Sequence, residues 1–217
     1  MIIRRASWLL VTSLSLLVAL VASRYLQFDP STYFAEQREI YLRRETILGL
    51  HIAGGMLALL LGPWQFVERI RVRWPRVHRS MGYGYVVGVG TGAAGGLLLA
   101  STAYGGVVSS LGFGALAVLW AWTTLRGVLS ARNGIASEHR RWMVMSFSLS
   151  FAAVTLRLML GAVQGFDDAG LSPVSFATAY PLIAWLCWVP NLALASWWTR
   201  DRRVCVISIE PAASGSD

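Results

Sequence analysis

Six long apolar stretches dominate the sequence. They run approximately over residues 7–26, 46–67, 82–103, 107–130, 142–163 and 174–198. About 20 apolar residues, rising 1.5 Å each as a helix, cross the roughly 30 Å hydrocarbon core of a bilayer. Six buried helices of a soluble protein would need a polar shell that 217 residues cannot supply. We therefore expect an all-α fold, a polytopic membrane helix bundle with about six transmembrane helices.

The placement of the charges predicts the orientation of the bundle. The chain has 19 basic residues, all arginine, against 11 acidic ones. If both termini are cytoplasmic, the cytoplasmic segments hold 14 arginines and five acids, and the opposite segments hold four arginines and six acids. Cytoplasmic loops near membrane spans keep the positive charge. The net charge of +8 therefore indicates a topology in a lipid bilayer and does not indicate nucleic-acid binding.

No linker, repeat or low-complexity tract divides the chain, so we expect a single membrane domain over 1–217. Residues 1–45 hold the first helix and an outer segment, within which 29–44 can form one interfacial helix. The first helix begins like a signal peptide, but its apolar run is long and its cleavage pattern poor, which predicts an uncleaved span. The turn at 104–106 predicts a tight hairpin. A sixth helix over 174–203 precedes a flexible tail over 204–217.

The third apolar stretch carries four glycines at successive spacings of four. This spacing places them on one helix face, where missing side chains allow another helix to approach closely. Close helix packing is one interpretation of the seam; a groove for a flat ligand is the other. The glycines are Gly84, Gly88, Gly92 and Gly96.

Two of the three histidines, His78 and His139, precede different apolar stretches at the same predicted depth. Two imidazoles so placed are what a bis-histidine haem iron requires, and neighbouring arginines can bind its propionates. Gln65 can join this polar cluster. Histidines at a membrane boundary also cap helices or pair with anions, so a structural role stays open. The arginines beside the pair are Arg76, Arg79, Arg140 and Arg141.

Arg157 lies within the fifth apolar stretch, at a depth comparable with that of His51 on the opposite side from the other histidines. An arginine within a span indicates a functional site, whose partner is a side chain or a ligand with an anion or carbonyl, such as a quinone. The candidate side-chain partners are His51, Glu45 and Gln164. The alternative is that Arg157 extends to the membrane surface.

Five short motifs carry a resemblance to a family of bacterial predicted membrane proteins, domain of unknown function 2306. The resemblance implies a four-helix membrane core over about 46–160, and a bacterial inner-membrane location. The chain is also distantly similar to the haem b membrane cytochromes, including ferric reductase and ascorbate-reducible types. Those proteins use two histidine pairs, whereas three histidines here support one haem at most. The motifs are HIAGG from His51, GPWQF from Gly62, HRSMGY from His78, HRRWM from His139 and TLRL from Thr155.

These observations lead to one leading hypothesis and one rival. The leading hypothesis is a membrane redox protein with one haem b, its iron bound by His78 and His139, and with a quinone or small acceptor near His51 and Arg157. The rival is a non-catalytic membrane subunit or a small-molecule transporter whose histidines are structural. The sequence shows no inverted repeat, and we expect no broken helix of the kind that builds transport sites.

Overall fold

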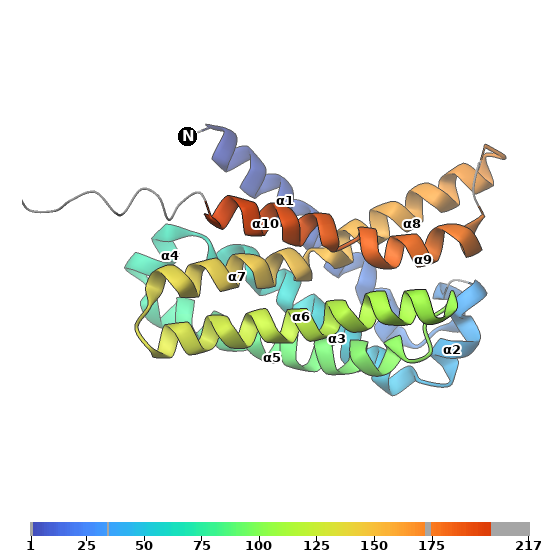
Figure 1. Cartoon of the computed structure of the whole chain (residues 1–217), viewed down its shortest axis with the longest axis horizontal. Helices are drawn as coiled ribbons and strands as arrows, with labels where there is room; N and C mark the ends of the chain where they lie inside the picture. The colour runs from blue at the N-terminus through green and yellow to red at the C-terminus, as the bar shows by residue number, and fades with distance from the viewer. Residues whose placement is uncertain (1, 34, 172–174, 201–217) are drawn as a thin grey trace, which may run out of the picture.

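The computed structural model describes residues 2–33, 35–171 and 175–200, and this part of the chain is helical without a β-strand. Four long helices, α3, α5, α6 and α7, form the body of the bundle, with α1 and α10 beside it (Figure 1). The elements are α1 (Ile2–Ala22), η1 (Ser23–Gln27), η2 (Pro30–Thr32), η3 (Ala35–Gln37), α2 (Arg38–Leu42), α3 (Glu45–Gln65), α4 (Glu68–Arg73), α5 (Pro75–Ala100), α6 (Gly106–Arg132), α7 (Ala136–Ser150), α8 (Ala152–Asp168), α9 (Phe176–Leu186) and α10 (Val189–Arg200).

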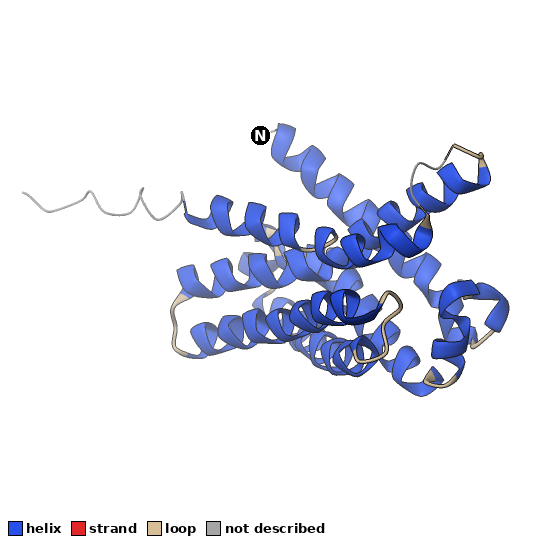
Figure 2. Cartoon of the chain, turned by 45° about the vertical axis from the view of Figure 1, so that its right-hand side comes forward, coloured by secondary structure: helices blue, strands red, loops and turns tan. Residues whose placement is uncertain are grey.

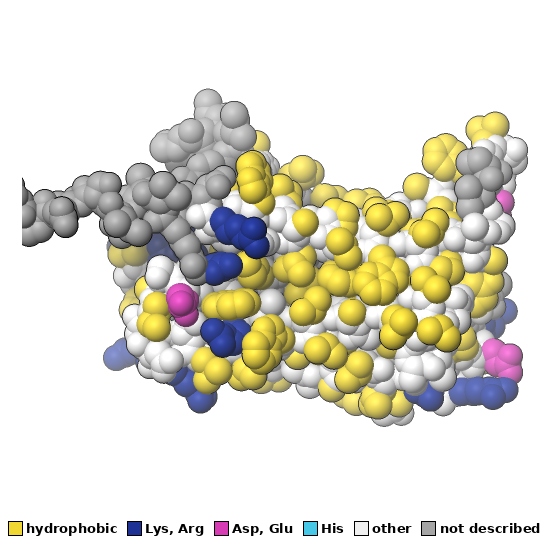
Figure 3. All heavy atoms as spheres, in the orientation of Figure 1, with side chains coloured by type: hydrophobic (Ala, Val, Ile, Leu, Met, Phe, Trp, Pro, Cys, Tyr) yellow, Lys and Arg dark blue, Asp and Glu magenta, His cyan; other side chains and the backbone are white. Residues whose placement is uncertain are grey.

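Six stretches of the described chain are long and apolar enough to cross a membrane, which confirms the expected helix bundle. On the face shown in Figure 3, apolar side chains cover the middle of the molecule, and the charged side chains lie toward its two ends. Large apolar residues face outward, as lipid contact requires. The spans are Ala6–Gln27, Glu45–Gln65, Pro75–Ala100, Gly106–Arg132, Ala136–Asp168 and Phe176–Arg200. The predicted tail over 204–217 lies outside the described residues.

The glycine seam of α5 packs against α3, and this contact between helices is the most extensive in the molecule. A Cβ on Gly54 of α3 would lie 2.4 Å from the backbone nitrogen of Gly92, and one on Gly88 would lie 2.8 Å from the carbonyl oxygen of Gly54. Such contacts are too short for any side chain. Close helix packing is therefore the correct interpretation of the seam, and α3 occupies the groove considered for a flat ligand.

Two of the spans are interrupted, which corrects the expectation of unbroken helices. The fifth span breaks between α7 and α8 at Phe151, and the sixth breaks between α9 and α10 at Cys187 and Trp188. Asn191 joins the two breaks, because its Nδ2 donates to Thr155 Oγ1 at 2.9 Å and to the carbonyl oxygen of Cys187 at 3.0 Å. Beyond its break α8 leans away from the body of the bundle (Figure 2), whereas α9 packs against α6.

The connection between α5 and α6 is the predicted hairpin, with positive φ at Gly105 (83°) and Gly106 (73°). The segment over 29–44, in contrast, is not one interfacial helix. It consists of the two short 3-10 helices η2 and η3 and the five-residue α2. Asp29 accepts from the backbone N–H of Ser31 at 2.9 Å, and Pro30 follows it, so a tight turn forms there. We name this segment the cap.

Candidate functional site

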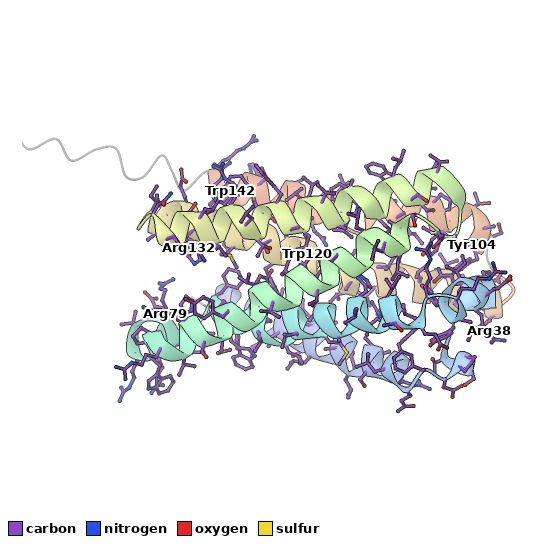
Figure 4. All side chains as sticks on the ribbon, turned by 90° about the horizontal axis from the view of Figure 1, so that it is seen from below. Arg38, Arg79, Tyr104, Trp120, Arg132 and Trp142 are labelled. Atoms are coloured by element: carbon purple, nitrogen blue, oxygen red, sulfur yellow. The ribbon has the colours of Figure 1, made fainter. Side chains whose placement is uncertain are left out.

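The expected site residues fall at two ends of the bundle. Arg79 and Arg132 mark one end, and Arg38 and Tyr104 mark the other (Figure 4). The helices α5 and α6 leave their hairpin near Tyr104 and diverge toward the first end. We call that first end, which carries His78 and His139, the histidine end. We call the opposite one, which carries the cap, the tyrosine end.

At the histidine end, His139 is held by the neighbouring helix. Its Nδ1 lies 2.8 Å from the carbonyl oxygen of Gly127 in α6. A carbonyl only accepts, so Nδ1 carries the proton and Nε2 keeps its lone pair. The helices approach closely here, because a Cβ on Gly127 would lie 2.6 Å from Met143 Sδ. The fold therefore fixes His139 in the tautomer that a metal-binding imidazole needs.

His78 is in contact with Gln65 at the end of α3. The start of α5 at Pro75, earlier than the predicted 82, brings His78 into the first turns of the helix, because proline suits the first helical position. With the Gln65 amide oriented to satisfy both its atoms, its nitrogen donates to His78 Nδ1 at 3.0 Å, and its oxygen accepts from Gly82 N at 3.3 Å. In this arrangement Nε2 of His78 carries the proton. A rotation of the amide by 180° reverses the assignment.

The two imidazoles lie close enough for their charges to interact. Beside them α3, α5 and α7 leave a narrow hollow that a water molecule cannot enter. It has no room for a small molecule, whose binding sites enclose roughly 300–1,000 Å³. The residues around it are Gly62, Gln65, Phe66, Tyr85, Met143 and Phe147. The structure places His78, His139 and Gln65 at one end, as the sequence pattern predicted, but that pattern did not predict how tightly aromatic side chains fill the space between them.

The arginines of the histidine end lie at its surface. The side chains of Arg79 and Arg140 are exposed. Arg126 lies over the rings of Trp122 and Trp142, at 5.8 and 5.2 Å from their centroids. Among the described residues no three His, Cys, Asp or Glu side chains gather as a metal-binding group.

A closed loop of hydrogen bonds joins α5, α6 and α7 behind the hollow, and sequence reasoning missed it. Trp120 Nε1–H is a donor only, so it donates to Ser150 Oγ (2.9 Å). With that bond fixed, Ser150 donates to Tyr85 (2.9 Å), Tyr85 donates to Ser146 (2.7 Å) and Ser146 donates to Thr124 (2.6 Å). Thr124 donates to the carbonyl oxygen of Trp120 at 2.8 Å. Each hydroxyl donates once and accepts once, so the loop leaves no buried hydroxyl of its own unpaired.

His51 of α3 lies inside the glycine seam toward the tyrosine end. Its Nδ1 donates to the carbonyl oxygen of Gly92 at 2.7 Å, and its side chain occupies space that Cβ atoms on Gly95 and Gly96 would fill. Nε2 of His51 therefore keeps its lone pair. Arg157 of α8 lies close enough for its charge to act on His51. The structure thus brings together the two residues considered for a substrate or quinone.

Arg157 has no carboxylate partner in the described part of the chain. Its one side-chain hydrogen bond runs from Nη1 to the carbonyl oxygen of Ala153 at 3.3 Å. Gln164 donates to Asp168 instead, and the two salt bridges found in the described residues are Arg43–Glu39 and Arg71–Glu68. The groups close enough for their charges to interact with Arg157 include Tyr25, Tyr41 and His51.

Comparison with known proteins gives one finding. Neither the curated proteins nor the solved structures contain a match to this chain. The model of one family, described as "Predicted membrane protein (DUF2306)", matches residues 48–199. The match covers the motifs at both ends, the interrupted spans and the hydroxyl loop. The chain therefore belongs to this family of predicted membrane proteins.

Proposed function

We propose that the chain is a membrane redox protein of the bacterial inner membrane, alone or with other membrane subunits. In this proposal His78 and His139 bind one haem b, and electrons are exchanged with a quinone or another small acceptor near His51 and Arg157. The observation that carries the proposal is the pairing of the two imidazoles at one end of the bundle, with His139 Nδ1–H held by the carbonyl of Gly127.

The donor set of the histidine end fits a haem iron. His139 offers the Nε2 lone pair, and His78 offers its own once the Gln65 amide turns its oxygen toward Nδ1. The hollow has no room for a macrocycle in this structure, so Met143 and Phe147 have to turn aside for binding. Arg79 and Arg140, exposed at the same end, are placed to bind propionates. When bound, haem b supplies a one-electron couple between ferrous and ferric iron.

The experiment is an absorbance spectrum of protein purified from haem-replete cells, with and without dithionite. We expect a reduced-minus-oxidised haem spectrum in the unmodified protein, and its loss in His78→Ala and in His139→Ala. Added imidazole restores the spectrum of either variant, because it replaces the missing ligand. Size-exclusion chromatography in detergent establishes that the variants are folded. Protein that carries no haem from such cells contradicts the proposal.

One observation favours the rival function, a small-molecule transporter. The interruptions at Phe151 and at Cys187 and Trp188 meet through Asn191, and membrane transporters build sites where spans are broken. A transporter predicts no chromophore. His78→Ala and His139→Ala then lower the yield of assembled protein and leave the visible spectrum unchanged, which separates the two functions in the same experiment.

A further inference from the structure

The tyrosine end holds an aromatic cluster drawn from three separate parts of the chain. The rings of Tyr25 and Tyr33 stack with centroids 5.6 Å apart, and the ring of Tyr41 meets that of Tyr33 edge-on at 5.5 Å. Gln37 of the cap accepts from the Tyr41 hydroxyl through Oε1, and its side chain lies beside Tyr180 of α9. The cap thus closes over α1, α3 and α9 with inward-facing polar side chains.

Two of these polar groups are buried without a hydrogen-bond partner. They are the hydroxyl of Tyr33 and the Nε2 of Gln37, and each residue is only 3% exposed. Both residues lie outside the membrane spans. Burial raises the pKa of the Tyr33 phenol, so the phenol keeps its proton and acts as a donor. Native proteins pair nearly all buried polar groups, so two unpaired donors in one cluster require an explanation.

Arg157 adds a third group of the same kind. Its guanidinium has five N–H donors, of which one bonds to the carbonyl of Ala153. Its charge interacts with Tyr25 and Tyr41, which both belong to the cluster. In the described residues no carboxylate pairs with Arg157. A charge within a membrane span needs a compensating partner or a ligand.

The unpaired groups of this end are thus three donors: a guanidinium, a phenol and an amide. They border an apolar aromatic cluster, and the neighbouring His51 contributes an Nε2 lone pair as an acceptor. A molecule with several hydrogen-bond acceptors would satisfy the donors, and an apolar body would suit the rings. A molecule that approaches from the bilayer meets both requirements if it carries carbonyl or carboxylate oxygens at one end.

We propose that the tyrosine end is a binding site for a lipid-soluble molecule whose carbonyl or carboxylate oxygens accept from Arg157, Tyr33 and Gln37. This inference rests on the proposed function only where it makes the bound molecule an electron acceptor. Binding itself needs no haem. Two membrane components share this head-group chemistry, a quinone and a fatty acid.

The test measures binding to the full chain in detergent, with a short-chain benzoquinone and with oleate as separate probes. Ligand-induced shifts of the thermal midpoint and isothermal titration give the dissociation constants. Tyr33→Phe removes one unpaired hydroxyl and little else, so the free protein stays as stable as before while the dissociation constant rises about tenfold. Arg157→Gln raises it further. Tyr83→Phe, the same change at an exposed position (65%) outside the cluster, is the matched control and leaves binding unchanged.

Binding of either probe that depends on both Tyr33 and Arg157 supports the site, and the probe that binds identifies the source of the head group. Failure of both probes, or binding that neither substitution weakens, overturns it. Repeating the titration with the haem-free His139→Ala variant separates this inference from the proposed function. Binding retained there supports the site whatever the spectrum of the unmodified protein shows, and binding lost there overturns a site that is independent of haem.

Discussion

The Tyr85 hydroxyl lies 2.7 Å from Ser146 Oγ, deep in the bundle, where both side chains are closed off from the surface. This contact is one of five bonds in the loop that begins and ends at Trp120. It connects α5 to α7, two helices that otherwise face each other across the hollow of the histidine end. The loop therefore links α5, α6 and α7 in the middle of the bundle.

Tyr85→Phe is expected to destabilise the protein by about 0.5–2 kcal/mol, because it leaves Ser146 and Ser150 each short of a partner in an apolar interior. The measurement is the thermal midpoint in detergent, followed by size-exclusion chromatography of the heated sample. Tyr83→Phe is the control, since its hydroxyl lies on an exposed side chain. Equal midpoints for the two variants would show that the loop contributes nothing to stability.

Gly54→Ala is expected to cost about 1–3 kcal/mol, because its Cβ meets the backbone of Gly92 at 2.4 Å and overpacking of this kind strains both helices. The adjacent Gly55→Ala is the matched control. A Cβ there meets nothing within 4 Å, and alanine favours the helix by up to about 1 kcal/mol over glycine. Thermal unfolding of both variants measures the difference. A seam in which both substitutions are equally tolerated would contradict the structure.

Gln65 is expected to govern the state of His78 in the proposed haem site. Gln65→Leu removes the group that orients the imidazole and lowers haem affinity by about 10–100-fold. Gln65→Glu supplies a carboxylate that accepts from Nδ1–H, which strengthens Nε2 as a ligand and favours ferric iron, so the midpoint potential falls. Haem titration and a spectroscopic redox titration measure the two effects. A potential that rises in Gln65→Glu contradicts the assigned contact.

Alkaline solution is expected to release the cap. Burial raises the pKa of Tyr41 well above its usual value of 10.0, and that of Tyr33 is raised as well. A raised pKa in the folded state means that the stabilising effect is complete below about pH 10 and is lost as the pH rises through the folded pKa. Limited proteolysis of the cap against pH measures this release. In Tyr41→Phe the release shifts to higher pH, because one ionising group is gone.

The sequence predicted those features that arise from single residues and their spacing. Length and hydropathy located the six spans, and Gly105 and Gly106 located the hairpin, because only these properties are needed to define them. The early start of α5 could also have been found from Pro75. The break at Phe151 could not, since no glycine or proline accompanies it.

The candidate sites were predicted in part for the same reason. Histidines and an arginine in apolar stretches are rare, so His78, His139, His51 and Arg157 stood out from the sequence alone. Serine and threonine are common in membrane spans, so nothing distinguished Ser146 or Ser150 from their neighbours before the fold brought them together. Tyr33 and Gln37 were equally ordinary members of a polar segment until their burial became visible.

The circular course of the loop through Trp120 has an electrostatic consequence. None of the five residues in the loop carries a charge, and their donors and acceptors satisfy one another around it. The middle of the bundle therefore gains polar adhesion among α5, α6 and α7 without the desolvation cost of a buried charge.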